Sequence, residues 1–428
     1  MPTDQLTIFA VSSGAPPAAI GVIRISGPMS ETALTQLTGR QFTPRRASLA
    51  KLKDVKGKIL DEALILWLPG PNNATGEDCA ELHCHGGRAV LAAVEKALSD
   101  IKGLRSAQPG EFTRRAFANG RIDLAEAEGL ADLLSAETEL QRAAAIANSS
   151  GVLSREVENW RSRLLCASAQ IEAALDFSDE DDVDALPESC TSNIQSLSDD
   201  IAAWLQRPRS DRLGAGVRVV LAGPPNAGKS TLFNALVESE AAITSDIAGT
   251  TRDVIERSVG IDGIPFVFVD TAGLREDSAD AIEAIGINRA NTELERADIV
   301  LWLGDEGEGP SGSWEVASRL DATDFVAKSK GAYSVSAKTN AGVFELKLAL
   351  GEAARQILPK PGEAALNARQ HAILTDVEEA LNAAQGQSDV LLIAEELRRA
   401  RIGFDKLVGK TTTEDMLDAL FGRFCIGK

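Results

Sequence analysis

The stretch from residue 223 to residue 230 constrains the fold more than any other part of the sequence. It reads Gly-Pro-Pro-Asn-Ala-Gly-Lys-Ser, between an apolar run at 217–222 and a helix-forming run at 231–237. This strand, loop and helix order is the setting that a phosphate-binding loop requires. The glycines let backbone N–H groups approach phosphate oxygens, Lys229 can reach the β- and γ-phosphates, and the Ser230 hydroxyl can bind Mg²⁺. The sequence therefore predicts a nucleotide-binding α/β unit.

Three later segments fit around the same nucleotide. Residues 246–251, Asp-Ile-Ala-Gly-Thr-Thr, offer a threonine to the Mg²⁺ shell, and Asp270 follows the apolar strand 265–269. Asp270 would lie near the metal, with an N–H group of Gly273 near the γ-phosphate. Ser336-Ala337-Lys338 resembles the guanine-supporting loop of GTPases. The predicted nucleotide-binding residues are Asn226, Ala227, Gly228, Lys229, Ser230, Thr231, Ser245, Asp246, Ile247, Ala248, Gly249, Thr250, Thr251, Asp270, Thr271, Ala272, Gly273, Ser336, Ala337 and Lys338.

Two positions depart from the GTPase pattern. No Asn-Lys-x-Asp stands between Asp298 and Ser336, and the best-placed substitute is Ala327-Lys328-Ser329-Lys330. A carboxylate normally accepts two N–H groups of guanine, whereas Lys offers only donors, so this interpretation predicts weakened discrimination of GTP from ATP. GTP stays the favoured nucleotide because the neighbouring elements match. Leu274 stands where Ras-like enzymes place a water-orienting Gln, so hydrolysis must use an ion, another side chain or a partner.

The rest of the chain divides by composition. In the first 120 residues, 21–26 and 63–68 predict strands and 88–99 predicts a helix. From about Ile122 the chain is rich in Ala, Glu and Leu, and apolar residues from Leu153 to Leu175 recur at helical spacing, which predicts the core of a helical bundle. The chain turns helical again after the α/β unit, so that unit is predicted to be inserted into a helical domain.

The cysteines and the net charge indicate the cellular compartment and the kind of ligand that the chain can bind. The five cysteines lack paired spacing, and no basic region of a signal peptide precedes the first apolar stretch, so we expect a soluble cytoplasmic protein. The formal charge of −19 makes the chain a poor binder of nucleic acid by itself. Arg114-Arg115 and Arg398-Arg399 could touch RNA or form salt-bridged faces.

One segment also suggests zinc. Cys79, His83, Cys84 and His85 lie close together in the sequence. On a strand, His83 and His85 would share one face while Cys84 points away, which disfavours a shared metal ion.

In these motifs the chain resembles the MnmE (TrmE) family of tRNA-modifying GTPases. Beside the segments above, the matching stretches are 21–28, 75–87, 109–124, 270–275 and the last five residues, Phe-Cys-Ile-Gly-Lys. The resemblance implies an α+β tetrahydrofolate-binding and dimerisation domain at 1–120, a helical domain in two halves at 121–215 and 357–428, and an inserted P-loop GTPase (Ras-like α/β) domain at 216–356.

The resemblance also implies an activity. It is that of a K⁺-dependent GTPase that acts as a homodimer with a flavin-dependent partner of the MnmG type, in a heterotetramer. Together they would add an aminomethyl-type (carboxymethylaminomethyl) group to C5 of the wobble uridine, U34, of certain tRNAs held largely by the partner. A tetrahydrofolate derivative, 5,10-methylene or 5-formyl, would be the one-carbon donor. The alternatives are a regulatory or ribosome-assembly GTPase without chemistry of its own, and a folate-dependent transferase merely regulated by nucleotide.

Site residues carry over from the family by position. The implied folate ligands are Arg24, Glu81, Arg121 (in place of the more usual Lys) and Lys428. The implied K⁺ ligands are Asn226, Ser245, Ile247 and Thr250, and the implied Mg²⁺ ligands are Ser230 and Thr251. Glu283 would position the attacking water, and it is the implied catalytic residue together with Asn226 and Lys229. For Lys428 to meet Arg24 and Glu81, the C-terminal segment must dock against an N-terminal domain, its own or a dimer mate's; the alternative is a frayed end.

Overall fold

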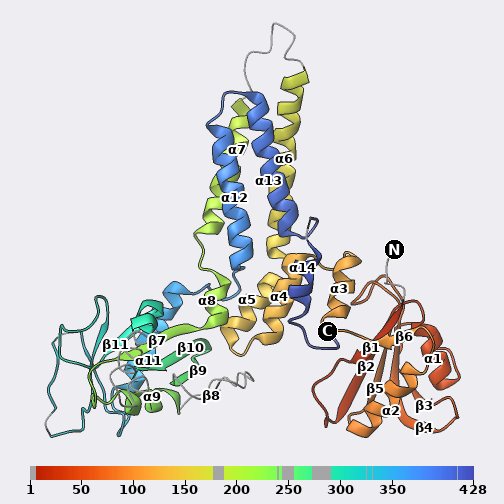
Figure 1. Ribbon diagram of the computed structural model, residues 1–428, viewed down its shortest axis with the longest axis horizontal. Coiled ribbons are helices and arrows are strands. Elements are labelled where there is room, and N and C mark those ends of the chain that lie inside the picture. Colours follow the sequence, from red (N-terminus) through yellow and green to blue (C-terminus); the bar gives the residue numbers. More distant parts are fainter. Residues whose placement is uncertain are drawn as a thin grey trace, which may run out of the picture. The chain divides into compact units, whose positions relative to one another are not determined.

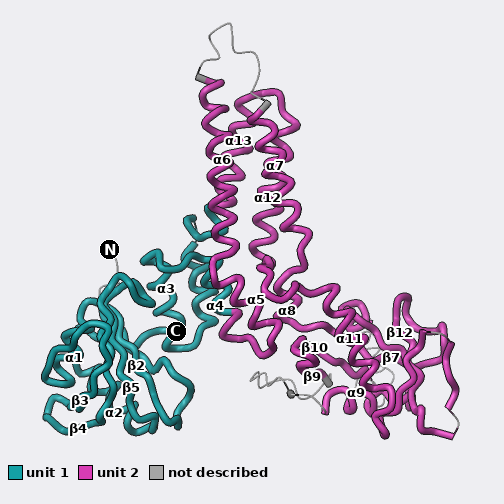
Figure 2. The backbone as a smooth tube through the Cα atoms, turned by 180° about the vertical axis from the view of Figure 1, so that it is seen from behind, with its two compact units in different colours: residues 1–131, 405–428 teal, residues 132–404 magenta. Residues whose placement is uncertain are grey.

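The computed structural model (Figure 1) describes residues 6–176, 188–238, 241–242, 255–271, 291–323, 325–329, 331–411 and 413–428. The chain forms two compact units, coloured separately in Figure 2. The first unit is Met1–Ala131 with Asp405–Lys428, and the second is Asp132–Phe404. The first unit therefore contains both ends of the described chain.

The first unit is built on a six-stranded sheet with the order β3-β4-β5-β2-β1-β6. Its pairs are antiparallel except for β1 with β6. The strands are β1 (Thr7–Val11), β2 (Ile20–Ser26), β3 (Ser48–Lys53), β4 (Ile59–Leu68), β5 (Cys79–His85) and β6 (Leu104–Ser106). Alternate residues of these strands enter one core with helices α1 (Ser30–Thr38) and α2 (Arg88–Ser99), so the predicted strands and helix are confirmed.

The same alternation decides the His and Cys positions on β5. Cys84 is buried in the core, whereas the side chains of His83 and His85 are 28% and 74% exposed. The predicted opposite facing of His83 and Cys84 is therefore confirmed. Arg24 on β2 pairs in register with Glu81 on β5, on the face that carries His83.

The C-terminal segment packs within this unit. Helices α3 (Glu111–Ala118), α4 (Leu124–Ser135) and α14 (Glu414–Phe421) enclose a small apolar cluster that includes Leu124, Leu420, Phe421 and Phe424. Arg114 on α3 forms ion pairs with Glu414 and Asp418 on α14. These contacts join α14 to α3 by both apolar packing and charge.

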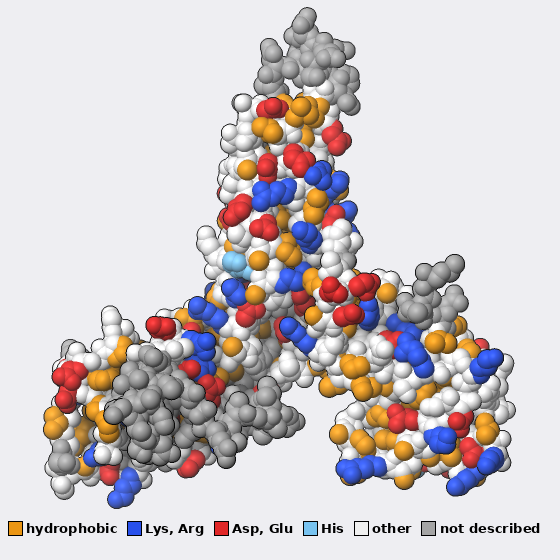
Figure 3. Space-filling model, viewed as in Figure 1, with side chains coloured by type: hydrophobic (Ala, Val, Ile, Leu, Met, Phe, Trp, Pro, Cys, Tyr) orange, Lys and Arg blue, Asp and Glu red, His pale blue; other side chains and the backbone are white. Residues whose placement is uncertain are grey.

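The second unit contains long helices that run side by side (Figure 1). They are α6 (Val152–Asp176), α7 (Glu188–Leu205), α12 (Ala368–Gln385) and α13 (Val390–Leu407), joined by the shorter α5 (Glu139–Ser149) and α8 (Ser210–Ala215). The predicted apolar stripe from Leu153 to Ile171 is buried, and Trp160 in it packs edge-on against Trp204. The bundle-core prediction is therefore confirmed, although Leu175 is only partly buried. On the face shown in Figure 3, Lys and Arg side chains of the bundle alternate with Asp and Glu.

A seven-stranded sheet forms the rest of this unit, in the order β13-β12-β11-β7-β10-β9-β8. Neighbouring strands from β13 to β10 are parallel, and β9 and β8 follow antiparallel. The strands are β7 (Val217–Ala222), β8 (Ala241–Ala242), β9 (Ile255–Ile261), β10 (Ile264–Asp270), β11 (Ile299–Trp302), β12 (Trp314–Ala317) and β13 (Tyr333–Ser334); α9 (Lys229–Val237) and α11 (Val343–Ile357) contribute to its core. The parallel strands direct their carboxyl ends, and the loops that follow, to one edge, where ligands bind in open α/β sheets.

The predicted fold class is therefore confirmed: an α+β unit, a helical bundle and an inserted Ras-like α/β sheet. Among the described residues, no helix combines the length and the apolar character that crossing a bilayer requires.

Candidate functional site

The phosphate-binding loop joins β7 to α9, as predicted. Gly223 and Gly228 have φ values of +146° and +91°, and Asn226 between them has φ +61°, a conformation that Asn tolerates better than most residues. A Cβ at Gly223 would lie 3.0 Å from the backbone N of Gly304, so glycine is required there. Lys229 is buried, and its Nζ donates to the carbonyl oxygens of Gly223 (3.0 Å) and Pro224 (2.8 Å). The ammonium group is thus held over the concave side of the loop, where phosphate oxygens can become acceptors in place of carbonyls.

The end of β10 lies beside this loop. Asp270 pairs in parallel register with Leu221, two residues before Gly223, and is 1% exposed. The Thr271 hydroxyl donates to the Leu221 carbonyl at 2.8 Å and ties the two strand ends together. The structure therefore brings Asp270 and the phosphate-binding loop to one edge of the sheet.

Ser230 and Thr231 occupy the first turn of α9, and both side chains are exposed on the surface of the chain. Several predicted residues lie outside the described part of the chain. They are Ser245, Asp246, Ile247, Ala248, Gly249, Thr250, Thr251, Ala272, Gly273 and Glu283.

A segment that the sequence interpretation did not consider lies beside the predicted Ser-Ala-Lys loop. Strand β12 pairs in parallel with β11, and Ser318-Arg319-Leu320-Asp321 follows it directly. Ser318 Oγ donates to the carbonyl of Ala227 at 2.7 Å, and Arg319 donates to the carbonyl of Asn226. Asp321 accepts a hydrogen bond of 2.6 Å from Ser336 Oγ, so the carboxylate meets the predicted Ser-Ala-Lys loop.

These four residues follow a parallel strand and end in a carboxylate beside the Ser-Ala-Lys loop, as Asn-Lys-x-Asp does in the GTPase pattern. The hydrogen bond from Ser336 lowers the pKa of Asp321 below its ordinary value, which favours an ionised side chain that can only accept hydrogen bonds. The predicted departure at Lys330 lies outside the described residues and stays a prediction. Residues 318–321 are the alternative that the structure offers, with Ser and Arg in the first two positions, so a search for the usual letters passes over them.

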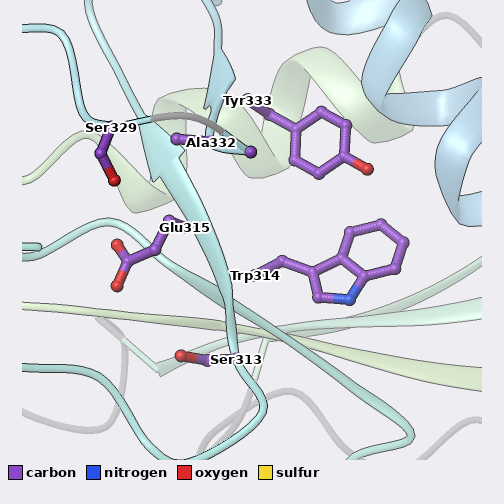
Figure 4. Close-up of a pocket in the computed structure, with 7 residues that line it drawn as sticks. Ser313, Trp314, Glu315, Ser329, Ala332 and Tyr333 are labelled. Carbon is purple, nitrogen blue, oxygen red and sulfur yellow. The ribbon is translucent and has the colours of Figure 1, made fainter. Parts of the chain in front are cut away.

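The substitute segment at 327–329 has a different role. Lys328 Nζ donates to Glu315 at 2.6 Å and to the Trp302 carbonyl at 3.1 Å, and Ser329 donates to Glu306. Figure 4 shows Ser329 and Glu315 on one flank of a pocket of about 340 Å³, with the stacked rings of Trp314 and Tyr333 on the other. Neither described side chain, Lys328 or Ser329, bonds to the phosphate-binding loop, and Lys330 lies outside the described residues.

A second candidate site lies in the first unit. Arg24 Nε and Nη2 both donate to Glu81 Oε1, at 3.1 and 2.9 Å. The Arg24 guanidinium also lies 5.8 Å from the centre of the Phe112 ring, and the Phe112 N–H donates to the Lys428 carbonyl at 3.2 Å. Phe112 therefore contacts two of the four implied folate ligands, Arg24 and Lys428, and Arg24 in turn binds a third, Glu81. The sequence interpretation did not single it out, although it lies within the matching stretch 109–124.

The C-terminal segment docks on the N-terminal part of its own chain. The Gly110 N–H donates to the Cys425 carbonyl at 3.5 Å, and Gly427, with φ +98°, lies so close to Val11 that a Cβ would be 2.1 Å from its carbonyl oxygen. The predicted docking is therefore confirmed, and the frayed end is excluded. Arg121 instead donates to the Asn73 carbonyl at 3.2 Å, and no hydrogen bond or ion pair of the described residues joins it to the other three.

The arginine pairs are engaged with carboxylates. Arg115 is buried against Glu77 and Glu111, and Arg114 pairs with α14. Arg398 and Arg399 pair with Glu395 and Glu396 on their own helix. The salt-bridged reading of these pairs is therefore confirmed.

The strand order and the phosphate-binding loop, with a carboxylate beside the Ser-Ala-Lys loop, define a P-loop GTPase. Residues 7–121 match the family described as the GTP-binding protein TrmE N-terminus, and residues 124–425 match the MnmE helical domain. Proteins named tRNA modification GTPase MnmE are 61% identical in Erythrobacter litoralis (99% of this chain, 100% of the relative) and 61% in Novosphingobium aromaticivorans (99% of each). The relative from Zymomonas mobilis is 48% identical (99% of this chain, 100% of the relative). The chain belongs to the MnmE (TrmE) family and is a GTP hydrolase of that family.

Proposed function

We propose that the protein couples K⁺-dependent hydrolysis of GTP to the modification of tRNA at the wobble uridine. With a flavin-dependent partner of the MnmG type, it would add an aminomethyl-type (carboxymethylaminomethyl) group to C5 of U34, using a tetrahydrofolate derivative as one-carbon donor. The observation that carries this proposal is the seating of Lys428 through Phe112 beside the Arg24–Glu81 pair. A purely regulatory or ribosome-assembly GTPase has no use for such a site.

The residues of the first unit fit a folate. An ionised Glu81 is an acceptor only, which suits the N–H donors at the amino-pyrimidine edge of a pterin. Arg24 holds the carboxylate in place, and the Phe112 ring offers an apolar surface beside it. The bound folate would supply the one-carbon unit that the proposed modification adds at C5 of U34. Lys428, carried by the docked segment, would add positive charge toward an anionic ligand.

The residues of the second unit fit GTP. Lys229 would exchange its carbonyl acceptors for phosphate oxygens, Ser230 and Asp270 would serve the Mg²⁺ ion, and Asp321 would read guanine. The exposed Asn226 can offer a neutral amide oxygen to K⁺ at the same loop. The other proposed K⁺ ligands, Thr251 and Glu283 lie outside the described residues. We further propose that the protein is cytoplasmic and acts as a homodimer.

The proposal is tested by mass spectrometry of wobble uridines in a deletion strain. Complementation with the full chain should restore the modified base. Complementation with a chain lacking residues 425–428 should not, while purified truncated protein keeps nearly normal K⁺-stimulated GTP hydrolysis because the phosphate-binding loop is built elsewhere. Unchanged wobble uridines in the deletion strain would instead favour the regulatory GTPase.

The K⁺ dependence has its own test. Hydrolysis should be faster in K⁺ than in Na⁺ at equal ionic strength, and Asn226→Ala should reduce that difference while leaving nucleotide binding mostly intact. Equal rates of the wild-type chain in the two salts would reject K⁺ dependence.

A further inference from the structure

His83 stands beside the second oxygen of Glu81. The two residues are separated by one position on β5 and therefore face the same side of the sheet. His83 Nε2 lies 3.4 Å from Glu81 Oε2. That nitrogen is buried, yet no atom of the described residues completes a hydrogen bond with it. A buried polar atom without a partner is uncommon and calls for a functional explanation.

In the described part of the chain, the Glu81 carboxylate is the charged group that lies within 4 Å of the His83 ring. In register with His83, β2 places Val22 and β4 places Leu64. Arg24 is the charged neighbour contributed by β2, and two of its N–H donors are directed at Glu81 Oε1. On β5 itself, His85 is paired with Asp61 at 2.7 Å. Among the described residues, Oε2 is therefore the acceptor that His83 Nε2 approaches.

The two oxygens of Glu81 are not equivalent. Oε1 accepts two N–H bonds from Arg24, which fills its acceptor capacity. Oε2 is then the oxygen open to a ligand, and its direction is set by whatever else contacts it. A Glu side chain rotates broadly about its last torsion, so one anchored oxygen alone fixes the carboxylate plane poorly.

We propose that His83 is a positioning residue of the folate site. In the tautomer with hydrogen on Nε2, it donates to Oε2 and sets the plane of the Glu81 carboxylate, leaving one acceptor direction for an N–H of the pterin edge. This role rests on the proposed function, because it gives Glu81 the folate ligand assigned there. His83 acts through Glu81 and does not itself touch the folate.

The test measures binding of 5-formyltetrahydrofolate to the full-length protein by calorimetry. His83→Leu removes the donor and should weaken binding about tenfold, as expected for losing a hydrogen bond to a charged group. His83→Gln restores an N–H donor and should bind within about threefold of the wild type. His85→Leu is the matched control, because it removes a His–carboxylate pair two positions along the same strand, and it should bind normally. The circular dichroism spectrum and the thermal unfolding transition, unchanged in all three variants, verify that each folds.

Two results would overturn the role of His83 alone: normal folate binding by His83→Leu, or equal loss in His83→Gln and His83→Leu. If the wild-type chain binds no folate, the proposed function fails and the role of His83 fails with it. The wild-type measurement therefore separates the two cases.

Discussion

At the scale of single residues, short hydrogen bonds decide what each loop can recognise. Asp321 is an acceptor poised by Ser336, whereas the basic residue beyond it, Lys328, is neutralised by Glu315. In the first unit, one oxygen of Glu81 accepts hydrogen bonds from Arg24, and the other oxygen lies 3.4 Å from His83 Nε2. In both proposed sites a carboxylate would recognise the ligand, and a neighbouring side chain would fix the charge or the direction of that carboxylate.

Asp321→Asn should weaken binding of GTP by roughly ten- to a hundredfold. The substitution replaces one carboxylate oxygen, an acceptor, by an NH₂ group, and this group would face an N–H donor of guanine. Binding of ATP should change little, so the preference for GTP should fall. Competition binding with a fluorescent guanine nucleotide measures both. Glu306→Gln is the control, since Glu306 accepts hydrogen bonds from Ser329 in the segment 327–329. An unaltered preference in Asp321→Asn would place guanine recognition on another residue.

The charge of Asp321 gives a pH prediction. Ser336 lowers the pKa of Asp321, so the ionised acceptor persists as pH falls and the guanine preference is lost only below the ordinary range of Asp. Ser336→Ala removes the donor and raises that pKa, so its preference for GTP should be lost at a higher pH than in the wild type. Competition binding over a pH series that extends below the ordinary pKa of Asp, about 3.9, measures the midpoints, and identical midpoints would contradict the argument.

At the scale of elements, sequence patterns predicted what is local and missed what depends on pairing. Strands 217–222 and 265–269 and the helix after the phosphate-binding loop follow from apolar runs and glycine spacing. Strand β12 has four residues, and the position of Asp321 follows from its register with β11, which is a non-local fact. The role of Phe112 was also missed because it depends on non-local contacts, with residues 24 and 428.

The docking of the C-terminal segment depends on Gly427. Gly427→Ala places a Cβ 2.1 Å from the Val11 carbonyl oxygen, so the segment should undock and carry Lys428 away from Phe112. Folate binding should be lost while GTP hydrolysis is retained. Gly39→Ala is the control, since Gly39 also has positive φ, at +75°, but open space around it. Calorimetry that finds equal folate affinity in Gly427→Ala and the control would show that the clash is relieved without undocking.

At the scale of the whole molecule, charge limits what the chain can hold by itself. The formal charge is −19, and the arginines that could have formed a basic patch are paired with carboxylates. On the face shown in Figure 3 the basic side chains are interspersed with acidic ones. These paired arginines therefore offer little positive charge to a polyanion such as RNA.

We expect the chain alone to bind tRNA no more tightly than a non-specific protein does. Phosphate contacts supply most of that affinity, and each needs a free Lys or Arg, so the dissociation constant at physiological salt should lie at or above roughly 10⁻⁶ M. Binding should tighten when a basic partner protein is added, and the tightened complex should show the steeper loss of affinity with rising salt. Filter binding with labelled tRNA over a salt series measures both. Nanomolar binding by the chain alone would mean that a basic surface forms outside the described residues, and the assignment of tRNA mainly to the partner would then be wrong.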